Sequence, residues 1–289
     1  MFTLENELLK ICVLGKGAEL QSIFHKKNQL EYLWSGDPAF WAKKSPILFP
    51  IVGTLKNDRY FYNNKSYILG RHGFARDMDF ETENQTTDSI SLSLRSNEIT
   101  LRQFPFRYEL IIKYSIGHDI LTVTYTVKNI DDGDMYFSIG AHPAFKVPLV
   151  EGTVYSDYYL KFEKDEFLPR WPISPLGLIE KNPIPLLQNS RILSLQKELF
   201  YKDALVFKHP SSSMLSLRSD KIQQGLNFSF PGFPYLGIWA AKNADFVCIE
   251  PWCGIADLVD SDQQIINKEG IIKLAAGEIF ERQWAAGFY

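Results

Sequence analysis

The sequence predicts an all-β protein, a large antiparallel β-sandwich with few short helices, and two observations lead to this prediction. Apolar and polar residues alternate with period two in several short segments, as they do in strands that bury one face. No segment sustains a helical period, and strands do not alternate with helices as in a parallel α/β sheet. We therefore expect one sandwich domain over residues 1–289, a length that a single all-β unit can reach.

The clearest predicted strands are those with one apolar face. Residues 89–94 alternate serine with isoleucine or leucine, and residues 121–127 alternate threonine with larger apolar side chains. Residues 60–62 and 67–69 flank Asn63-Asn64-Lys65-Ser66, which predicts a hairpin because asparagine tolerates positive φ. Further strands are expected at residues 108–116, 136–139, 213–217, 245–250, 271–274 and 279–284, with a turn at 275–278 joining the last two.

Only two segments favour helical turns, residues 98–103 before Pro105 and residues 189–199. The proline-rich stretch 169–185 contains Trp171, Ile173 and Ile179, and is therefore too apolar for a free linker. We expect it to be an ordered connection on the surface.

Composition narrows the class of partner. The formal net charge is −3, with acidic and basic residues mixed along the chain, so the electrostatic footprint of a nucleic-acid binder is missing. No apolar run is long enough for a membrane span, and the acidic N-terminus does not resemble a signal peptide. These features predict a cytoplasmic protein that binds a small molecule and neither nucleic acid nor a membrane. No coiled-coil pattern or exposed apolar stripe argues for a dimer.

Cysteines are few and odd in number. Cys12, Cys248 and Cys253 argue against a disulfide framework and fit a reducing compartment. They also lack the partners that zinc spacing would require, so we expect no metal site.

Two of the five histidines have distinctive sequence contexts. His142 lies in Gly-Ala-His-Pro-Ala-Phe at the end of the predicted strand 136–139, and a strand-end loop is a common place for a functional site. His72 lies in Gly-Arg-His-Gly-Phe-Ala-Arg, where small neighbours leave the ring accessible. The alternative interpretation of each is structural, because a histidine can simply cap a turn.

Glu250 is the most informative carboxylate. It ends the apolar strand 245–250 and precedes Pro251-Trp252-Cys253-Gly254. Desolvation there is costly unless the carboxylate is paired or used, and it would raise the pKa toward that of a general base at neutral pH. The alternative is an ion pair closing the strand end. Asp203 and Lys56 are weaker candidates, and a purely structural role is an open alternative for each.

Taken together, these contexts resemble the aldose 1-epimerase (mutarotase) family, and in particular its LacX-like branch. The resemblance spans nearly the whole chain. The blocks that carry it are Glu31–Trp34, Pro46–Gly53, His72–Arg76, Gly140–Phe145, Tyr235–Trp239 and Ile249–Gly254, in this order.

The resemblance implies a β-sandwich whose concave face holds a hexose. It assigns Glu250 as the base on the C1 hydroxyl and His142 as the acid on the ring oxygen, and places His72 beside the same oxygen. Asp203 matches the substrate-binding aspartate of the family, although its neighbours match poorly, and Trp239 ends a block expected to contact the sugar. Lys56 stands near the position where galactose mutarotases have an arginine, which changes the expected contacts because the two cations are not interchangeable.

The implied reaction exchanges the α and β anomers by acid/base ring opening and needs no cofactor or metal. Two alternatives stay open at this point. One is a sugar-binding or regulatory module without activity on the same fold. The other is a glycoside hydrolase that pairs Glu250 with Asp203, which would leave His142 without a role.

Overall fold

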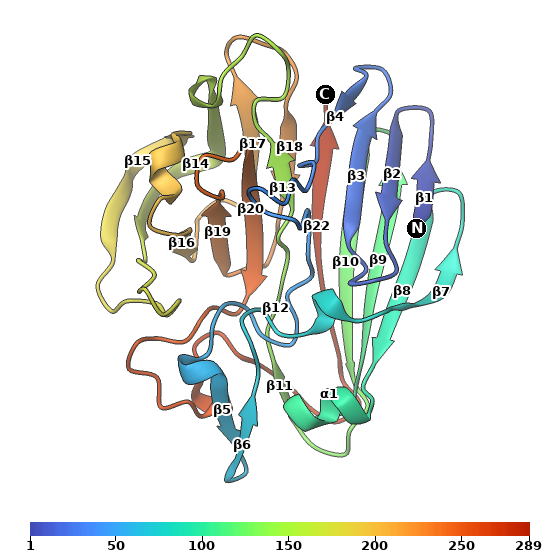
Figure 1. The fold of residues 1–289 in the computed structure, drawn as a ribbon, viewed down its shortest axis with the longest axis vertical. Helices are drawn as coiled ribbons and strands as arrows, with labels where there is room; N and C mark the ends of the chain where they lie inside the picture. Colours follow the sequence, from blue (N-terminus) through green and yellow to red (C-terminus); the bar gives the residue numbers. More distant parts are fainter.

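Antiparallel strands dominate the structure, a computed structural model that describes residues 1–289. The largest sheet has nine strands in the order β15-β14-β17-β18-β22-β10-β9-β8-β7 (Figure 1). Their bounds are β7 Glu81–Gln85, β8 Ser89–Arg95, β9 Tyr108–Gly117, β10 Ile120–Asn129, β14 Tyr158–Arg170, β15 Ile184–Ser194, β17 Met214–Ser219, β18 Leu226–Ser229 and β22 Ile279–Phe288. The all-β prediction is confirmed.

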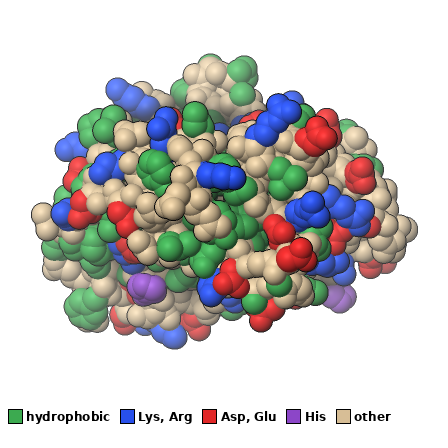
Figure 2. Space-filling view, turned by 90° about the horizontal axis from the view of Figure 1, so that it is seen from below, with side chains coloured by type: hydrophobic (Ala, Val, Ile, Leu, Met, Phe, Trp, Pro, Cys, Tyr) green, Lys and Arg blue, Asp and Glu red, His purple; other side chains and the backbone are tan.

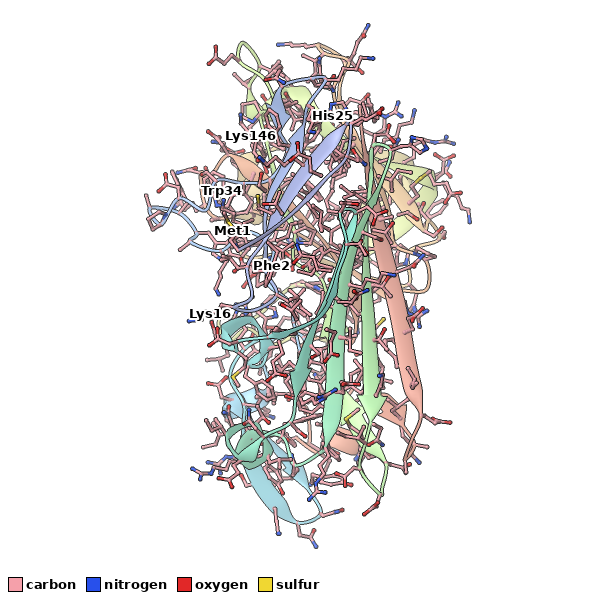
Figure 3. The ribbon with its side chains drawn as sticks, turned by 90° about the vertical axis from the view of Figure 1, so that its right-hand side faces the viewer. Met1, Phe2, Lys16, His25, Trp34 and Lys146 are labelled. Atoms are coloured by element: carbon pink, nitrogen blue, oxygen red, sulfur yellow. The ribbon has the colours of Figure 1, made fainter.

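Two smaller sheets form a second layer against the large one. A four-stranded sheet β1-β2-β3-β4 lies against β8, β9 and β10, as Figure 3 shows from the side, where β3 ends at His25. A five-stranded sheet, β12-β20-β19-β16 with β13 also paired to β20, lies beside it in the same layer (Figure 1). The bounds are β1 Phe2–Glu5, β2 Leu9–Val13, β3 Leu20–His25, β4 Leu30–Glu31, β12 Ile139–Gly140, β13 Ala144–Lys146, β16 Leu205–Lys208, β19 Tyr235–Trp239 and β20 Phe246–Cys253.

Short elements complete the fold. The pairs β5 (Arg59–Tyr62)–β6 (Lys65–Ile68) and β11 (Met135–Phe137)–β21 (Ile272–Leu274) lie at the lower end of Figure 1. The β5–β6 hairpin is the predicted one, and Asn63 and Asn64 both have positive φ in its turn. The predicted turn at 98–103 is helix α1 (Glu98–Gln103), which Asn97 caps by accepting hydrogen bonds from two backbone N–H groups.

The core lies between the two layers and follows the predicted alternation. On β10, Leu121, Val123, Tyr125 and Val127 are fully buried, while the threonines between them are partly exposed. Burying each such apolar side chain contributes about 1.5–3 kcal/mol. Strand β20 differs because every one of its residues is buried, which means that other parts of the protein cover both of its faces. This makes β20 a rigid base for any side chain that it carries.

One secondary-structure prediction was wrong. Residues 189–194 belong to strand β15, which pairs with β14, and only Lys197–Phe200 form a short 3₁₀ turn. The register irregularities near Asn189, which has positive φ, break the period-two pattern that would have identified the strand. Cross-strand pairing therefore overrides the weak helical preference of this segment.

The predicted connection at 169–185 is ordered, since Trp171 forms a bridge to Val206 and Ile179 forms one to Leu258. All three cysteines are free. None of the helices is both long and apolar enough to cross a membrane. Cationic and acidic side chains are interspersed over the lower face of the molecule (Figure 2).

Candidate functional site

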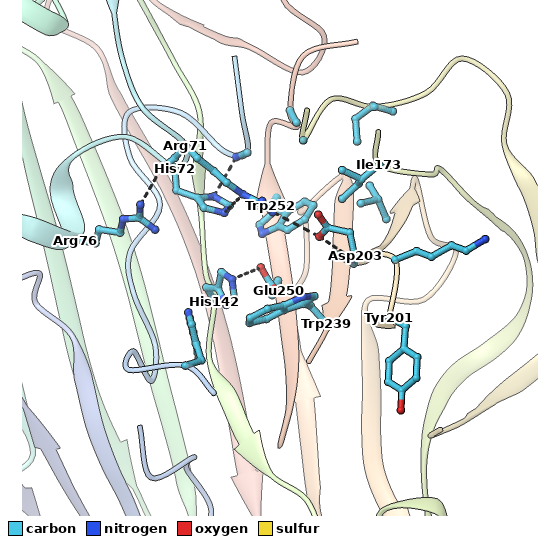
Figure 4. A pocket seen from close by; sticks show the side chains of 18 residues that line it. Arg71, His72, Arg76, His142, Ile173, Tyr201, Asp203, Trp239, Glu250 and Trp252 are labelled. Atoms are coloured by element: carbon cyan, nitrogen blue, oxygen red, sulfur yellow. Dashed lines mark hydrogen bonds and ion pairs between the residues drawn. The ribbon is translucent and has the colours of Figure 1, made fainter. Parts of the chain in front are cut away.

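A cavity of about 560 Å³ opens over strands β19 and β20 of the five-stranded sheet (Figure 4). The connection after β14 and the loops around residues 71–76 and 201–204 form its walls. Five of the six predicted site residues line it, namely His72, His142, Asp203, Trp239 and Glu250. Its size lies within the range of small-molecule sites.

Strand pairing brings His142 and Glu250 together. Glu250 lies on β20, and His142 lies in the loop between β12 and β13, which both pair with β20. Two further backbone hydrogen bonds fix that loop, from the N–H of Ala141 to the Pro251 carbonyl and from the N–H of Ile249 to the Pro143 carbonyl. The His142 Nε2 atom consequently lies 3.2 Å from Oε2 of Glu250. Both side chains are almost completely buried.

Burial decides the protonation of this pair. It raises the pKa of the Glu250 carboxyl well above its usual range, although the positive charge of Arg71 opposes the shift. It lowers the pKa of His142 to about 3. Both shifts disfavour charge, so at neutral pH we assign one shared proton to the short contact between Oε2 and Nε2. One proton on two groups is what a reaction with one acid and one base requires.

His72 presents a hydrogen-bond donor to the same cavity. Its Nδ1 accepts a hydrogen bond from the Gly53 N–H at 3.1 Å, and its backbone N–H donates to the Gly53 carbonyl. Burial lowers its pKa well below the usual value, so the ring is neutral and carries its single proton on Nε2. Nε2 lies 3.3 Å from Nε of Arg71, and because both atoms then bear hydrogen we regard this as a close approach without a hydrogen bond. The backbone at His72 has φ 68°, a strained conformation that the two contacts to Gly53 maintain.

Asp203 and Arg71 face each other across the opening. Nη2 of Arg71 lies 3.6 Å from Oδ1 of Asp203, and both side chains are partly exposed. Asp203 has φ 123°, a left-handed conformation that non-glycine residues rarely adopt. Its carboxylate also accepts a hydrogen bond from the N–H of Ala204, which holds the side chain in place. Arg71 reaches both His72 and Asp203.

Three tryptophans shape the interior of the cavity. Trp41 stacks on His142 with ring centroids 4.9 Å apart, and Trp239 meets the same ring edge-on at 5.6 Å. Trp252 fits between Gly140 and Gly237, because a Cβ atom at either glycine would lie within 2.5 Å of the indole. Trp41 and Trp252 were missed by sequence reasoning, since an aromatic residue in a β protein is more often core than site.

Polar nitrogens remain unpaired in this interior. Nδ1 of His142 and Nε1 of Trp252 are buried and have no hydrogen-bond partner. Unpaired buried polar atoms are rare in folded proteins and favour a ligand or water as their partner.

Lys56 lies apart from the cavity. Its Nζ donates to the carbonyl of Ser261 at 3.3 Å, and its backbone N–H donates to the carboxylate of Asp257. The cationic side chains that line the cavity are instead Arg71, Arg76 and Lys202. Loop packing places Lys202 in the same cavity lining as the two arginines, and no simple pattern in the sequence indicates this.

One group of side chains has the donor atoms of a metal site. A nitrogen of His142, the sulfur of Cys248 and an oxygen of Glu250 lie within 4.8 Å of one another, and all three residues are buried. Imidazole, thiolate and carboxylate are zinc ligands, but burial raises the pKa of the Cys248 thiol well above its usual value and disfavours the thiolate. Two of the three donors, His142 and Glu250, also form the proton-sharing pair, so a metal ion bound here would be bound by that pair.

Known proteins match the chain over nearly its whole length. The family model described as aldose 1-epimerase matches residues 1–273. The chain is 34% identical over 281 residues to the chromosomal LacX protein of Lactococcus lactis subsp. lactis, covering 94% of this chain and 93% of that protein. The plasmid LacX protein of the same organism matches equally well.

Solved structures agree in fold. A galactose mutarotase related enzyme from Lactobacillus acidophilus has a TM-score of 0.95 at 34% identity, covering 100% of this chain and 97% of that chain. A galactose mutarotase-like protein from Lactobacillus casei ATCC 334 has a TM-score of 0.94 at 31% identity, covering 100% of both chains. The chain therefore belongs to the aldose 1-epimerase family.

Proposed function

We propose that this protein is an isomerase that interconverts the α and β anomers of a hexose or related aldose. The observation that carries the proposal is the buried contact of 3.2 Å between His142 and Glu250 on the floor of the cavity. A protein that only binds sugar has no need of a desolvated acid/base pair. The family supports the reaction class, and the burial of both side chains supports proton transfer with little competition from water.

The reaction requires one proton to leave the sugar and one to enter it. With a sugar bound at the pair, Glu250 in its carboxylate form takes the proton of the C1 hydroxyl, and the electron pair of that O–H bond forms the C1 carbonyl. The C1–O5 bond breaks, and O5 takes the proton that His142 carries. Rotation about C1–C2 turns the aldehyde over, and the reverse transfers close the ring.

The shared proton makes this cycle self-contained. Moving it from Glu250 to His142 creates the ionised pair, and each ring opening followed by ring closure restores the starting proton count. The Nε2–H of His72 and the positive charge of Arg71 lie on the same side of the cavity and would stabilise negative charge that develops on the sugar oxygens. General acid and general base each contribute about 10²–10⁴ in rate.

The test is anomer exchange followed by proton NMR, with the uncatalysed rate subtracted. We expect Glu250→Gln and His142→Asn each to lower the catalysed rate by about 10²–10⁴ while the circular dichroism spectrum stays unchanged. Glu166→Gln is the matched control, because Glu166 is equally buried but accepts hydrogen bonds from the Ser211 and Ser212 N–H groups outside the cavity. A Glu250→Gln variant with wild-type turnover would refute the assigned base.

The same assay distinguishes the two alternatives. A sugar-binding module would show ligand shifts in the spectra and leave exchange at the solvent rate. A glycoside hydrolase would release reducing sugar from a glycoside. The hydrolase is disfavoured because it would pair Glu250 with Asp203 and leave His142, which lies 3.2 Å from Glu250, without a role.

A further inference from the structure

Resting on the proposed function, we infer that the substrate is an anionic aldose, one that carries a phosphate or carboxylate group at the end remote from C1. The observation behind the inference is the charge of the cavity. Three cationic side chains, Arg71, Arg76 and Lys202, line it, against one partly exposed carboxylate, that of Asp203. The lining's other acid, Glu250, shares a single proton with His142 and adds no net charge to the cavity.

The two arginines are held in position beside each other. Nη2 of Arg76 donates a hydrogen bond to the backbone carbonyl of Arg71 at 2.9 Å, which ties the guanidinium to the loop that carries Arg71 and His72 (Figure 4). The Arg71 side chain reaches over His72 toward Asp203. Each guanidinium has five N–H donors, and the contacts within the protein use only some of them. The remaining donors suit an oxyanion.

The acid nearest to Arg76 does not cancel its charge within the cavity. Oδ2 of Asp77 lies 3.6 Å from Nε of Arg76, but Asp77 is largely exposed and does not line the cavity. The Nζ of Lys43 lies 3.5 Å from the same carboxylate. Asp77 is thus shared between two cations in solvent, where such a contact is weak.

The positive field reaches the reacting pair. Arg71 and Arg76 both contribute to the lowered pKa values of His72 and His142, although burial is the larger cause. A neutral hexose would leave the three cations of the lining with the carboxylate of Asp203 as their one ionised partner inside the cavity. An anionic group on the substrate would supply that charge, and it would also draw the sugar toward the site.

The experiment compares KM and kcat for anomer exchange on glucose and galactose, on their 6-phosphates, and on glucuronic and galacturonic acids. We expect a KM at least 10-fold lower for one anionic series than for the neutral sugars at low ionic strength. The preference should shrink as salt is added, because screening weakens the attraction. The phosphate and carboxylate series distinguish the two sources of charge. Inorganic phosphate should inhibit competitively if the group is a phosphate.

The double variant Arg76→Gln/Lys202→Met should reduce the ratio of kcat/KM for the anionic over the neutral sugar by about 10-fold or more. Lys221→Met is the matched control, because Lys221 is an exposed lysine that pairs with Asp157 outside the cavity lining. Equal KM values for neutral and anionic sugars, without inhibition by phosphate, would overturn the inference and leave the mutarotase proposal intact. Calorimetric binding of an anionic sugar without any exchange would instead overturn the mutarotase proposal and keep the ligand class.

Discussion

The protein buries two acid/base pairs, and they differ in how completely the protein satisfies them. Asp257 and Lys268 form an ion pair with 2.9 Å between Oδ1 and Nζ. The Lys268 ammonium also donates to the Ile255 carbonyl, and the second oxygen of Asp257 accepts a hydrogen bond from the Lys56 N–H. Both pairs line a cavity, but Glu250 and His142 make one short contact with each other and leave Nδ1 of His142 without a partner.

This difference indicates which buried pair is structural. A pair whose nitrogen and oxygen atoms each have a partner within the protein holds elements together, here the segments around residues 56, 257 and 268. A pair that keeps an unpaired hydrogen-bonding atom beside a cavity can form that hydrogen bond only with a bound ligand or water. Burial is therefore a poor guide to function by itself, and the hydrogen-bond inventory around the buried group distinguishes the two cases.

The largest effect that would sharpen this comparison is on stability. Lys268→Met leaves Asp257 as a buried carboxylate without its cation, and we expect the free energy of unfolding to fall by about 3–5 kcal/mol. Glu250→Gln should leave the free energy of unfolding within about 1 kcal/mol of wild type, because an amide can keep the contact to His142. Urea denaturation measures both.

A double variant, Lys268→Met/Asp257→Asn, keeps this prediction testable if the single variant does not fold. It removes both charges, so it should recover much of the lost stability. Equal losses for Lys268→Met and Glu250→Gln would show that the two pairs do not differ in the way described.

The pH dependence of exchange tests the shared proton. Activity needs one proton on the pair, so it is lost when a second proton binds at low pH or when the first leaves at high pH. Burial lowers the pKa of His142 to about 3 and raises that of Glu250. We expect kcat/KM, corrected for the uncatalysed rate, to be flat from pH 7 to pH 5 and to fall only below about pH 4. An acid limb centred near pH 6.5 would mean that His142 titrates like an exposed imidazole.

The smallest effect is expected at Lys56. Its side chain lies on the outside of the Asp257–Lys268 region and not in the cavity lining, and only its backbone N–H contacts Asp257. Lys56→Met should therefore change KM and kcat less than 2-fold and lower the free energy of unfolding by less than about 0.5 kcal/mol. Exchange kinetics and urea denaturation check this, and a KM raised 10-fold would restore Lys56 as a substrate contact.

The sequence was informative where the chemistry is local. Alternation identified β8 and β10, since a strand with one buried face must repeat every two residues, and the asparagines of the turn identified the β5–β6 hairpin. It failed at residues 189–194, where bulges break that period. The burial of Glu250 followed from the apolar strand before it and the loop after it.

The site could be predicted only in part. His72, His142 and Glu250 have distinctive neighbours, but no local pattern shows that Arg71 reaches across to Asp203 or that Trp41 stacks on His142. Those contacts join segments more than 100 residues apart, and loop packing produces them. The position of Lys56 was equally inaccessible, because its side chain donates a hydrogen bond to the carbonyl of Ser261, 205 residues further along the chain.

The placement of Trp252 between Gly140 and Gly237 has a consequence for how this site can change. The indole occupies space that two missing side chains leave free, so the three positions act as one unit. A smaller residue at 252 alone would open a void, and a larger residue at 140 or 237 alone would collide with the ring. Remodelling this wall for a bulkier ligand therefore calls for coordinated substitutions, and single-site libraries would find mostly damaged proteins.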